Sequence, residues 1–275
     1  MAEKDLTMED DWGAKGAQAT GAQVQKFLKD QIKSLHDKDT NLQTQINSLN
    51  TAQDKANLQL HAATDGCFVT YTRKSDTVQC AVPWWEWSAK EDAGEVADGV
   101  LVLIDGQAPI IVAPTQTNLT WSKNSIAVNA NIGNTDFTKV YVDYTGKTRT
   151  AAIIAKAIEL FGEEEENWTQ YAPAWCNAYD RRHDKGNNTM IGIGPGKWWL
   201  PSIAELIIIW KHKYAINQCL SVISGASQLS ESWYWSSTEV SSLSAWTLHL
   251  FSGELLIGYP KTMAHGYVRA VTAFH

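Results

Sequence analysis

The sequence has 275 residues, a hydrophobic fraction of 44%, 13 tryptophans and a formal net charge of −7. This apolar content is enough for a packed core, which excludes general disorder. The negative charge argues against nucleic acid as a partner, because phosphate binding needs a basic surface.

The opening residues, MAEKDLTMEDDW, show no charged stretch followed by an apolar one. The sequence therefore predicts no signal peptide, and synthesis and folding in a cytoplasm. It contains no run of about 18 apolar residues, so no membrane span is predicted. The four cysteines are far apart and form no CxxC pair. Buried free thiols are expected, with a Cys67–Cys80 bridge as the alternative.

The aromatic residues are concentrated after residue 65, which divides the chain. Residues 1–20 are charged and rich in Gly and Ala, and they are predicted to form a flexible N-terminal segment. Residues 21–64 are predicted to form a coiled-coil oligomerisation stalk, because alternating steps of four and three follow one seam. The seam positions are Leu28, Ile32, Leu35, Asp39, Leu42, Ile46, Leu49, Gln53, Ala56, Leu60 and Ala63.

The number of helices in the stalk is left open by the seam residues. Pairs such as Ile32 and Leu35 favour dimers, whereas the polar Asp39 and Gln53 set register and can also change the strand number. A homo-oligomer through residues 24–63 is expected, with a homotrimer favoured and a dimer as the alternative. A lone helix packed on its own domain is a weaker interpretation, because it would tolerate drift toward a period of 3.6.

Residues 65–275 are predicted to form one domain that begins with strands. The strand candidates are CFVTYTR, DTVQCAVPWWEW, the two halves of GVLVLIDGQAPIIVAP around a DGQ hairpin turn, and KVYVDYTGK. A helix is expected over TAAIIAKAIELFGE, ending at Gly162. A second helix begins at LPSIAEL, where Ser202 and Glu205 have the spacing of a capping box.

Short strands return after residue 225, in WYWSS, AWTLHLF, GELLIGY and GYVRAVTAF. In AWTLHLF, alternation predicts that Thr247 and His249 point outward, opposite to Trp246 and Leu248. The order of strands, helices and strands predicts an α+β fold with a mainly antiparallel sheet and two helices.

The sequence offers no arrangement typical of catalysis. The histidines lack metal-ligand spacing, GIGPG lacks the residues of a phosphate loop, and no GxSxG elbow occurs. We therefore expect no enzyme, no metal and no cofactor. At least half of the tryptophans in WWEW and KWW are expected to lie in the core. Aromatic residues that remain exposed are common anchors of recognition surfaces. This pattern favours a binding module.

The ordered series GKWWLPSIAEL, YWSSTE, AW, FSGE and GYVRAV resembles C-type lectin-like domains of the formylglycine-generating-enzyme type. It is especially similar to the variable proteins of diversity-generating retroelements and their relatives in gut bacteria and phages. The resemblance covers residues 143–275 well and 65–275 loosely. It implies a fixed scaffold that carries a hypervariable ligand-binding face. The implied scaffold residues are Trp198, Leu200, Pro201, Glu205, Leu206, Tyr234, Trp235, Ser236, Ser237, Trp246, Gly253, Val268 and Arg269.

The interleaved positions become the candidate variable face. They are Trp233, Val240, Ser242, Leu243, Ser244, Thr247, His249, Glu254, Leu255, Ile257, Tyr259, Thr262, Ala264 and His265. The chain lacks the EPN, QPD and WND calcium motifs, so calcium-dependent sugar binding is not expected. It also has no counterpart of the cysteine pair of the formylglycine-generating enzymes, so that activity is not carried over.

The resemblance and the stalk together predict a receptor-binding protein of a phage tail fibre or tip, located in the virion. Its expected partner is a protein or glycan on a bacterial cell surface. The alternative is a bacterial surface or secreted adhesin of the same fold. A remote alternative is an oxidase of the formylglycine-generating type.

Overall fold

A computed structural model describes most of the chain, with the side chains of residues 21–23, 51–61 and 161 left aside. The described ranges are 21–61, 66–103, 106–122, 136–162, 170–263 and 266–274. The chain divides into two units, Met1–Gln53 and Asp54–His275, and each is described by itself.

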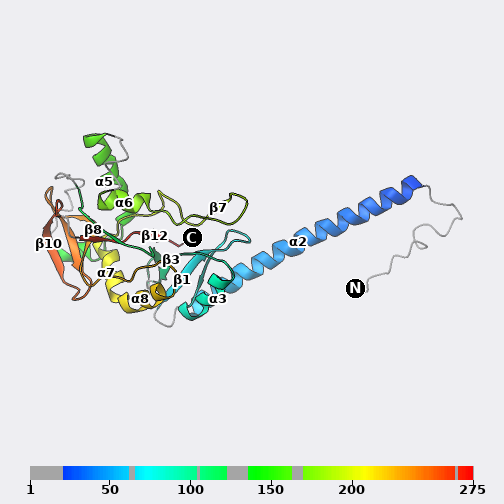
Figure 1. Cartoon of the computed structure of the whole chain (residues 1–275), viewed down its shortest axis with the longest axis horizontal. Coiled ribbons are helices and arrows are strands. Elements are labelled where there is room, and N and C mark those ends of the chain that lie inside the picture. The colour runs from blue at the N-terminus through cyan, green and yellow to red at the C-terminus, as the bar shows by residue number, and fades with distance from the viewer. Residues whose placement is uncertain are drawn as a thin grey trace. The chain divides into compact units, whose positions relative to one another are not determined.

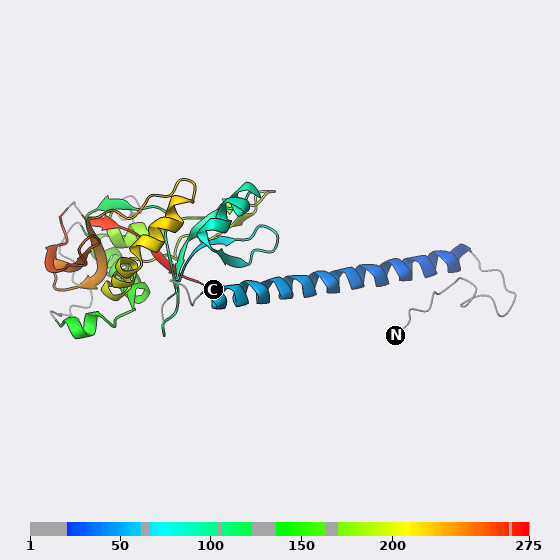
Figure 2. The same cartoon turned by 90° about the horizontal axis from the view of Figure 1, so that it is seen from below.

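Helix α2 runs without interruption over Gly21–His61 (Figure 2). This confirms that the heptad segment is helical. The apolar seam residues whose side chains are described are 48–69% exposed. They are Leu28, Ile32, Leu35, Leu42, Ile46 and Leu49. An apolar stripe of this kind is stable in water only when another surface covers it.

Unit 2 contains two five-stranded sheets, here called sheet A and sheet B. Sheet A is antiparallel throughout. Its strands, in spatial order, are β12 (Val271–Ala273), β4 (Ile110–Val112), β3 (Ala97–Val102), β1 (Cys67–Thr72) and β2 (Gln79–Val82). β3 and β4 are adjacent antiparallel strands, as expected for the two halves of GVLVLIDGQAPIIVAP.

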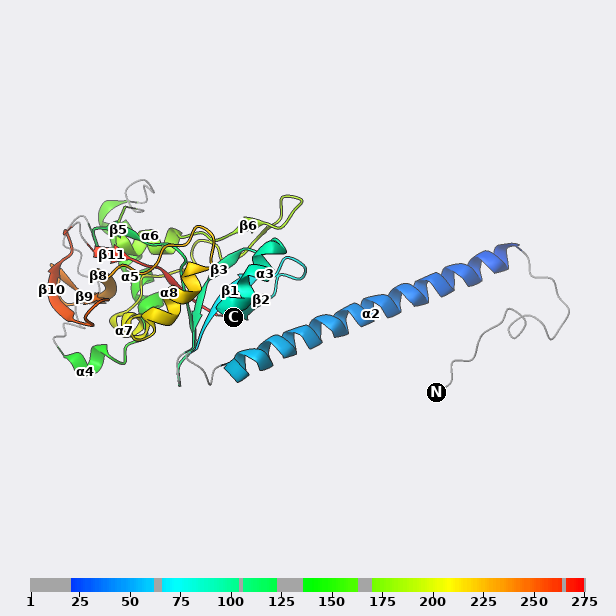
Figure 3. The same cartoon turned by 60° about the horizontal axis from the view of Figure 1, so that its bottom comes forward.

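Sheet B is antiparallel except for the β8–β11 pair. Its strands, in spatial order, are β10 (Leu255–Pro260), β9 (Ser244–His249), β8 (Trp233–Glu239), β11 (Gly266–Val268) and β5 (Thr117–Leu119). Figure 3 shows β8, β9 and β10 at one end of unit 2 and β1, β2 and β3 at the other. A small hairpin, β6 (His183–Asp184) with β7 (Met190–Ile191), stands apart from both sheets.

The segment GYVRAVTAF was predicted as one strand, but it divides into β11 of sheet B and β12 of sheet A. Arg269 lies at the crossing and is buried. Its guanidinium donates hydrogen bonds to the carbonyl oxygens of Ala113, at 2.8 Å, and Ser227, at 2.7 Å. These charge-assisted bonds compensate the burial of the cation and hold the crossing in place.

After α2, the described part of unit 2 contains six α-helices, which corrects the expectation of two; the two that the sequence predicts are among them. Their bounds are α3 Trp87–Asp92, α4 Phe137–Val140, α5 Gly146–Phe161, α6 Ala172–Ala178, α7 Ile203–Lys211 and α8 Lys213–Ser221. At the start of α7, Ser202 accepts a hydrogen bond from the Glu205 amide, and the Glu205 carboxylate accepts one from the Ser202 amide. The predicted capping box is therefore confirmed. Figure 1 shows α7 and α8 between the two sheets.

Two strand predictions were wrong. The second half of DTVQCAVPWWEW leaves β2 at Val82 and becomes a 3-10 turn, Trp84–Glu86, followed by α3. The segment KVYVDYTGK forms the end of α4 and the start of α5 rather than a strand. In both cases apolar residues follow one another without a strict period, and tertiary packing decides between helix and strand.

The described part of unit 2 is thus an α+β structure with mainly antiparallel sheets. All four cysteines are free thiols, as expected, and the alternative bridge does not form. The β1–β2 register places Cys80 opposite Tyr71, whereas Cys67 lies opposite Val102 of β3. Within the described ranges, no helix is long and apolar enough to cross a membrane.

Candidate functional site

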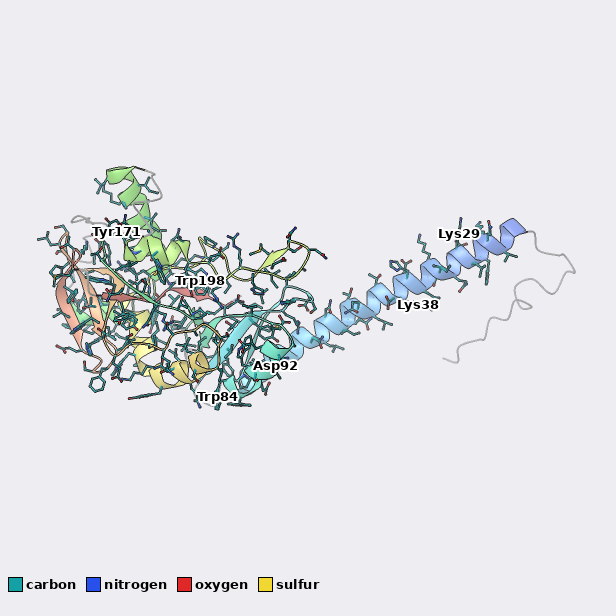
Figure 4. All side chains as sticks on the ribbon, in the orientation of Figure 1. Lys29, Lys38, Trp84, Asp92, Tyr171 and Trp198 are labelled. Carbon is teal, nitrogen blue, oxygen red and sulfur yellow. The ribbon has the colours of Figure 1, made fainter. Side chains whose placement is uncertain are left out.

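The implied scaffold residues form a buried frame beneath sheet B and around α7. Each of them is buried except Gly253, which is half-buried in the turn between β9 and β10. Gly253 has a φ of 76°, and a Cβ atom there would lie 2.3 Å from the Trp210 ring. Only glycine fits this position. Trp198 is labelled within the frame in Figure 4.

The frame is hydrogen-bonded as well as packed. The indole of Trp235 donates to the carbonyl oxygen of Leu119, at 2.9 Å, and the Ser236 hydroxyl donates to the carbonyl oxygen of Trp246, at 2.7 Å. Because these buried polar groups find their hydrogen-bond partners in only one arrangement, the bonds favour a single conformation of the core. The residues of YWSSTE therefore belong to the folded core, not to its surface.

An aromatic cluster lies on β8, β9 and β10, on the same face of sheet B as the buried Trp235. Trp233 lies opposite His249 across the β8–β9 pair, and their ring centroids are 4.9 Å apart. Tyr259 of β10 is stacked on Trp233 with centroids 6.3 Å apart and meets the buried Trp235 edge-on at 5.0 Å. Trp233, His249 and Tyr259 are half-buried, so their rings combine a fixed position with an accessible surface.

The candidate residues in the adjoining turns are the most exposed members of the set. Ser242, Leu243, Glu254 and Thr262 are exposed, and Leu243 is 64% exposed. Val240, Leu255 and Ile257 are half-buried. The last three pack against the hydrophobic core that contains Trp246 and Leu248, so only part of each side chain is accessible. Ala264 and His265 lie outside the described residues.

Two of the candidate residues are buried, which corrects the expectation of an outward position. Ser244 is 8% exposed, and its hydroxyl lies 2.9 Å from that of Ser241. Thr247 is fully buried between its cross-strand partners Trp235 and Leu256. Thr247 does share a face with His249, but that face of sheet B is covered at its centre. Alternation fixes the face of a side chain, not its exposure.

The Thr247 hydroxyl lacks a hydrogen-bond partner among the described residues. A buried hydroxyl without a partner is destabilising, and valine has the same shape without the polar atom. We expect Thr247→Val to raise the free energy of unfolding by about 1 kcal/mol in urea titration. A decrease would show that the hydroxyl has a partner in solution, and Thr247→Ala gives the cost of the lost volume.

A second exposed aromatic group was missed from the sequence. Tyr214 of α8 is 76% exposed and Phe251 is 60% exposed, and Lys213 lies between them. The Lys213 ammonium is 5.0 Å from the Tyr214 ring centroid and 5.5 Å from that of Phe251. It also donates to the carbonyl oxygens of Leu250 and Phe251, both at 2.9 Å. These bonds give Lys213 a structural role in holding the β9–β10 turn.

The tryptophan-rich segments divide as expected between core and surface. Trp87, Trp198 and Trp199 are buried, whereas Trp85 is 59% exposed. Trp84, labelled in Figure 4, is half-buried and packs edge-on against Trp85 with centroids 5.7 Å apart. Both rings belong to the side of unit 2 that carries sheet A, away from the aromatic cluster.

The fold and this surface together define an α+β protein with an aromatic face on a three-stranded edge of sheet B. No protein-family model matches the chain, and no curated protein is significantly similar to it. Among solved structures, a fimbrial protein from Bacteroides ovatus is similar at 15% sequence identity, with a TM-score of 0.44. The match covers 60% of this chain and 35% of that one. This chain therefore spans about a third of the fimbrial protein's length, and a likeness at this level does not define a shared fold or activity.

Proposed function

We propose that this chain is a ligand-binding protein with a C-type lectin-like head, and that its variable face lies on β8, β9 and β10. The observation that carries the proposal is the separation of roles in one short region. The residues of YWSSTE are buried, while Trp233, His249 and Tyr259 meet at the surface above them. A rigid aromatic cluster beside exposed turns is the arrangement expected of a recognition surface.

Oligomerisation through α2 is the second part of the proposal. The exposed seam of α2 would be covered in a homo-oligomer, which would bring several heads together on one stalk. Several linked heads bind a cell surface far more strongly than one, because the later contacts are intramolecular. A receptor-binding protein of the phage tail-fibre type fits this design, and its ligand would be a protein or glycan on a bacterial surface. We propose a binding role rather than an enzymatic one.

Trp233→Ala is expected to weaken binding by about 30-fold or more, which is the effect of losing a hot-spot residue. The matched control is Trp85→Ala, which removes an exposed tryptophan from the side of unit 2 that carries sheet A. The fluorescently labelled full chain would be tested on a panel of whole bacterial cells and on an array of bacterial surface glycans. Binding that Trp85→Ala abolishes and Trp233→Ala leaves intact would contradict the proposed site.

The variability of the face has its own test. Sequences of this protein from several isolates are expected to differ mainly at the exposed and half-buried candidate positions. Thr247 and Ser244 are expected to vary less, since both are buried. An even scatter of substitutions over the chain would refute a dedicated variable face, even if the protein binds a ligand.

A further inference from the structure

From Leu28 onward, two polar residues interrupt the apolar seam of α2, and both occupy the same type of heptad position, as does Gln25 in the first turns. With Ile32 and Ile46 at position a, Asp39 and Gln53 also fall at a. From Leu28 onward, the d positions of α2 are all apolar: Leu28, Leu35, Leu42, Leu49 and Ala56. The polar layers are thus confined to one of the two seam positions.

This distribution discriminates between parallel and antiparallel pairing. In a parallel coiled coil, a side chains share a layer with a side chains of the neighbouring helix, whereas reversing one helix places a opposite d. Any antiparallel alignment therefore sets Asp39 and Gln53 against apolar d residues. Burying a carboxylate or an amide against apolar side chains costs free energy without compensation. A parallel arrangement avoids that cost.

The same residues also determine the register of a parallel assembly. A shift by one heptad would place Asp39 opposite Ile32 or Ile46 of the neighbouring helix, and Gln53 opposite another apolar residue. A shift by two heptads would set Asp39 opposite Gln53, but it would leave two heptads of the seam uncovered at each end. Zero shift matches both polar layers and covers the whole seam. A few polar layers at a are known to specify register at some cost in stability.

Lys38 supplies the charge that a layer of aspartates needs. An a side chain packs into a hole of the facing helix that includes the residue just before the facing a position. For Asp39 this residue is Lys38 of the neighbouring copy, whose place on α2 is labelled in Figure 4. Within the described part of the chain, the ion pairs involve neither Lys38 nor Asp39. Both charges are available to a partner.

Some polar side chains outside the seam of α2 are bonded within the helix. The hydroxyls of Thr40 and Thr44 donate to the carbonyl oxygens of His36 and Thr40, and Gln45 donates to Asn41 at 2.8 Å. These bonds join residues four apart, none of which occupies an a or d position. The seam is the surface of α2 that remains to be covered.

We infer that copies of this chain associate through α2 in parallel and in register, with each Asp39 paired to Lys38 of a neighbouring copy. The inference rests on the stalk part of the proposed function and adds orientation, register and the residues that specify them. A parallel stalk places all heads at the same end, which is the arrangement in which they can bind one cell surface together.

Disulfide trapping in the full chain tests the orientation. Two differently tagged proteins would carry Leu28→Cys or Leu60→Cys in a Cys67→Ser background, and they would be mixed, unfolded and refolded together in a redox buffer. Parallel pairing is expected to give 28–28 and 60–60 disulfides at least about tenfold more often than 28–60. In an antiparallel pair the two 28 positions would be about 48 Å apart, and 28–60 bonds would dominate.

Substitutions within α2 test the residues that specify the arrangement. Asp39→Leu is expected to raise the thermal midpoint of the oligomer. It is also expected to raise the yield of 28–60 disulfides to within about twofold of the yields of 28–28 and 60–60 disulfides. Lys38→Glu is expected to weaken association about tenfold, since attraction becomes repulsion. Lys33→Glu, on the outer face, is the matched control and is expected to change little.

Each outcome decides a separate point. Dominant 28–60 bonds would overturn the parallel arrangement, and an unchanged ratio in Asp39→Leu would overturn the role of Asp39. Equal effects of Lys38→Glu and Lys33→Glu would overturn the ion pair. A chain that light scattering shows to be monomeric would overturn this inference and the proposed stalk, but ligand binding through Trp233 would stand on its own measurement.

Discussion

Replacing Lys261 by methionine is expected to lower the free energy of unfolding of this protein by about 3–5 kcal/mol. Lys261 is fully buried, and its ammonium forms an ion pair with the Glu239 carboxylate, which is itself 2% exposed. The same ammonium lies 4.4 Å from the centroid of the Trp121 ring. Methionine fills much of the same volume but leaves the Glu239 charge in the interior without its cation. The loss is large because the site offers little solvent to replace the ammonium.

The double variant Glu239→Leu with Lys261→Met separates the charge from the packing. Removing both charges leaves neither uncompensated, so it should recover most of the stability lost in the single variant. Urea unfolding followed by tryptophan fluorescence measures all three proteins. A double variant as unstable as Lys261→Met would mean that packing, not the unpaired carboxylate, causes the loss.

This ion pair also fixes the turns of the candidate face. Glu239 is the last residue of β8, and Lys261 follows β10 directly. The Lys261 amide donates to the carbonyl oxygen of Leu243, at 3.0 Å, and its own carbonyl accepts from the Trp121 amide, at 2.9 Å. The turns that follow β8 and β10 are therefore anchored at the residues where they begin.

The elements that could be predicted from the residues alone are those whose signals are local. Ser202 and Glu205 are three residues apart, and a capping box needs no other part of the chain. The heptads of α2 are likewise visible in a continuous stretch. Alternation in AWTLHLF placed Trp246 and Leu248 on one face, and both are buried there.

The parts of the candidate site that could not be predicted depend on contacts between residues that are distant in sequence. Thr247 was expected at the surface because alternation cannot show that Trp235 and Leu256 flank it in the neighbouring strands. The aromatic cluster needs Tyr259 beside Trp233, and that pairing depends on a bulge in β10 between Leu256 and Tyr259. A bulge of this kind changes which side chains meet, and the sequence shows only a glycine.

Glu205 occupies an environment that makes stability depend on pH. Its carboxylate is 3% exposed, accepts a hydrogen bond from the Ser202 amide at 2.7 Å, and lies 3.2 Å from the Trp199 indole nitrogen. Burial raises the pKa of Glu205 to about 7, and these hydrogen bonds offset only part of that effect. Asp98, buried beside Thr72, has its pKa raised to about 6 for the same reason. Both carboxyl groups therefore hold protons more tightly in the folded state.

The sign of the effect follows from proton binding. Between the unfolded pKa of Glu205, 4.5, and its folded pKa of about 7, the native state binds more protons than the unfolded state. Stability is therefore greatest below the lower value and decreases as pH rises through the higher one. The whole window corresponds to about 3 kcal/mol, of which about 1.4 kcal/mol falls between pH 6 and pH 8.

Glu205→Gln is expected to remove this slope, because the amide keeps the shape of the capping box but does not titrate. Urea unfolding of both proteins from pH 5 to pH 8 would show wild-type stability falling relative to the variant as pH rises. The difference between the two proteins is the informative quantity, since the pKa of His183 is lowered by burial and contributes a slope of opposite sign. Asp98→Asn is the matched control, and its effect is expected mainly below about pH 6. Parallel curves for wild type and Glu205→Gln would mean that Glu205 is ionised in the folded protein throughout this range.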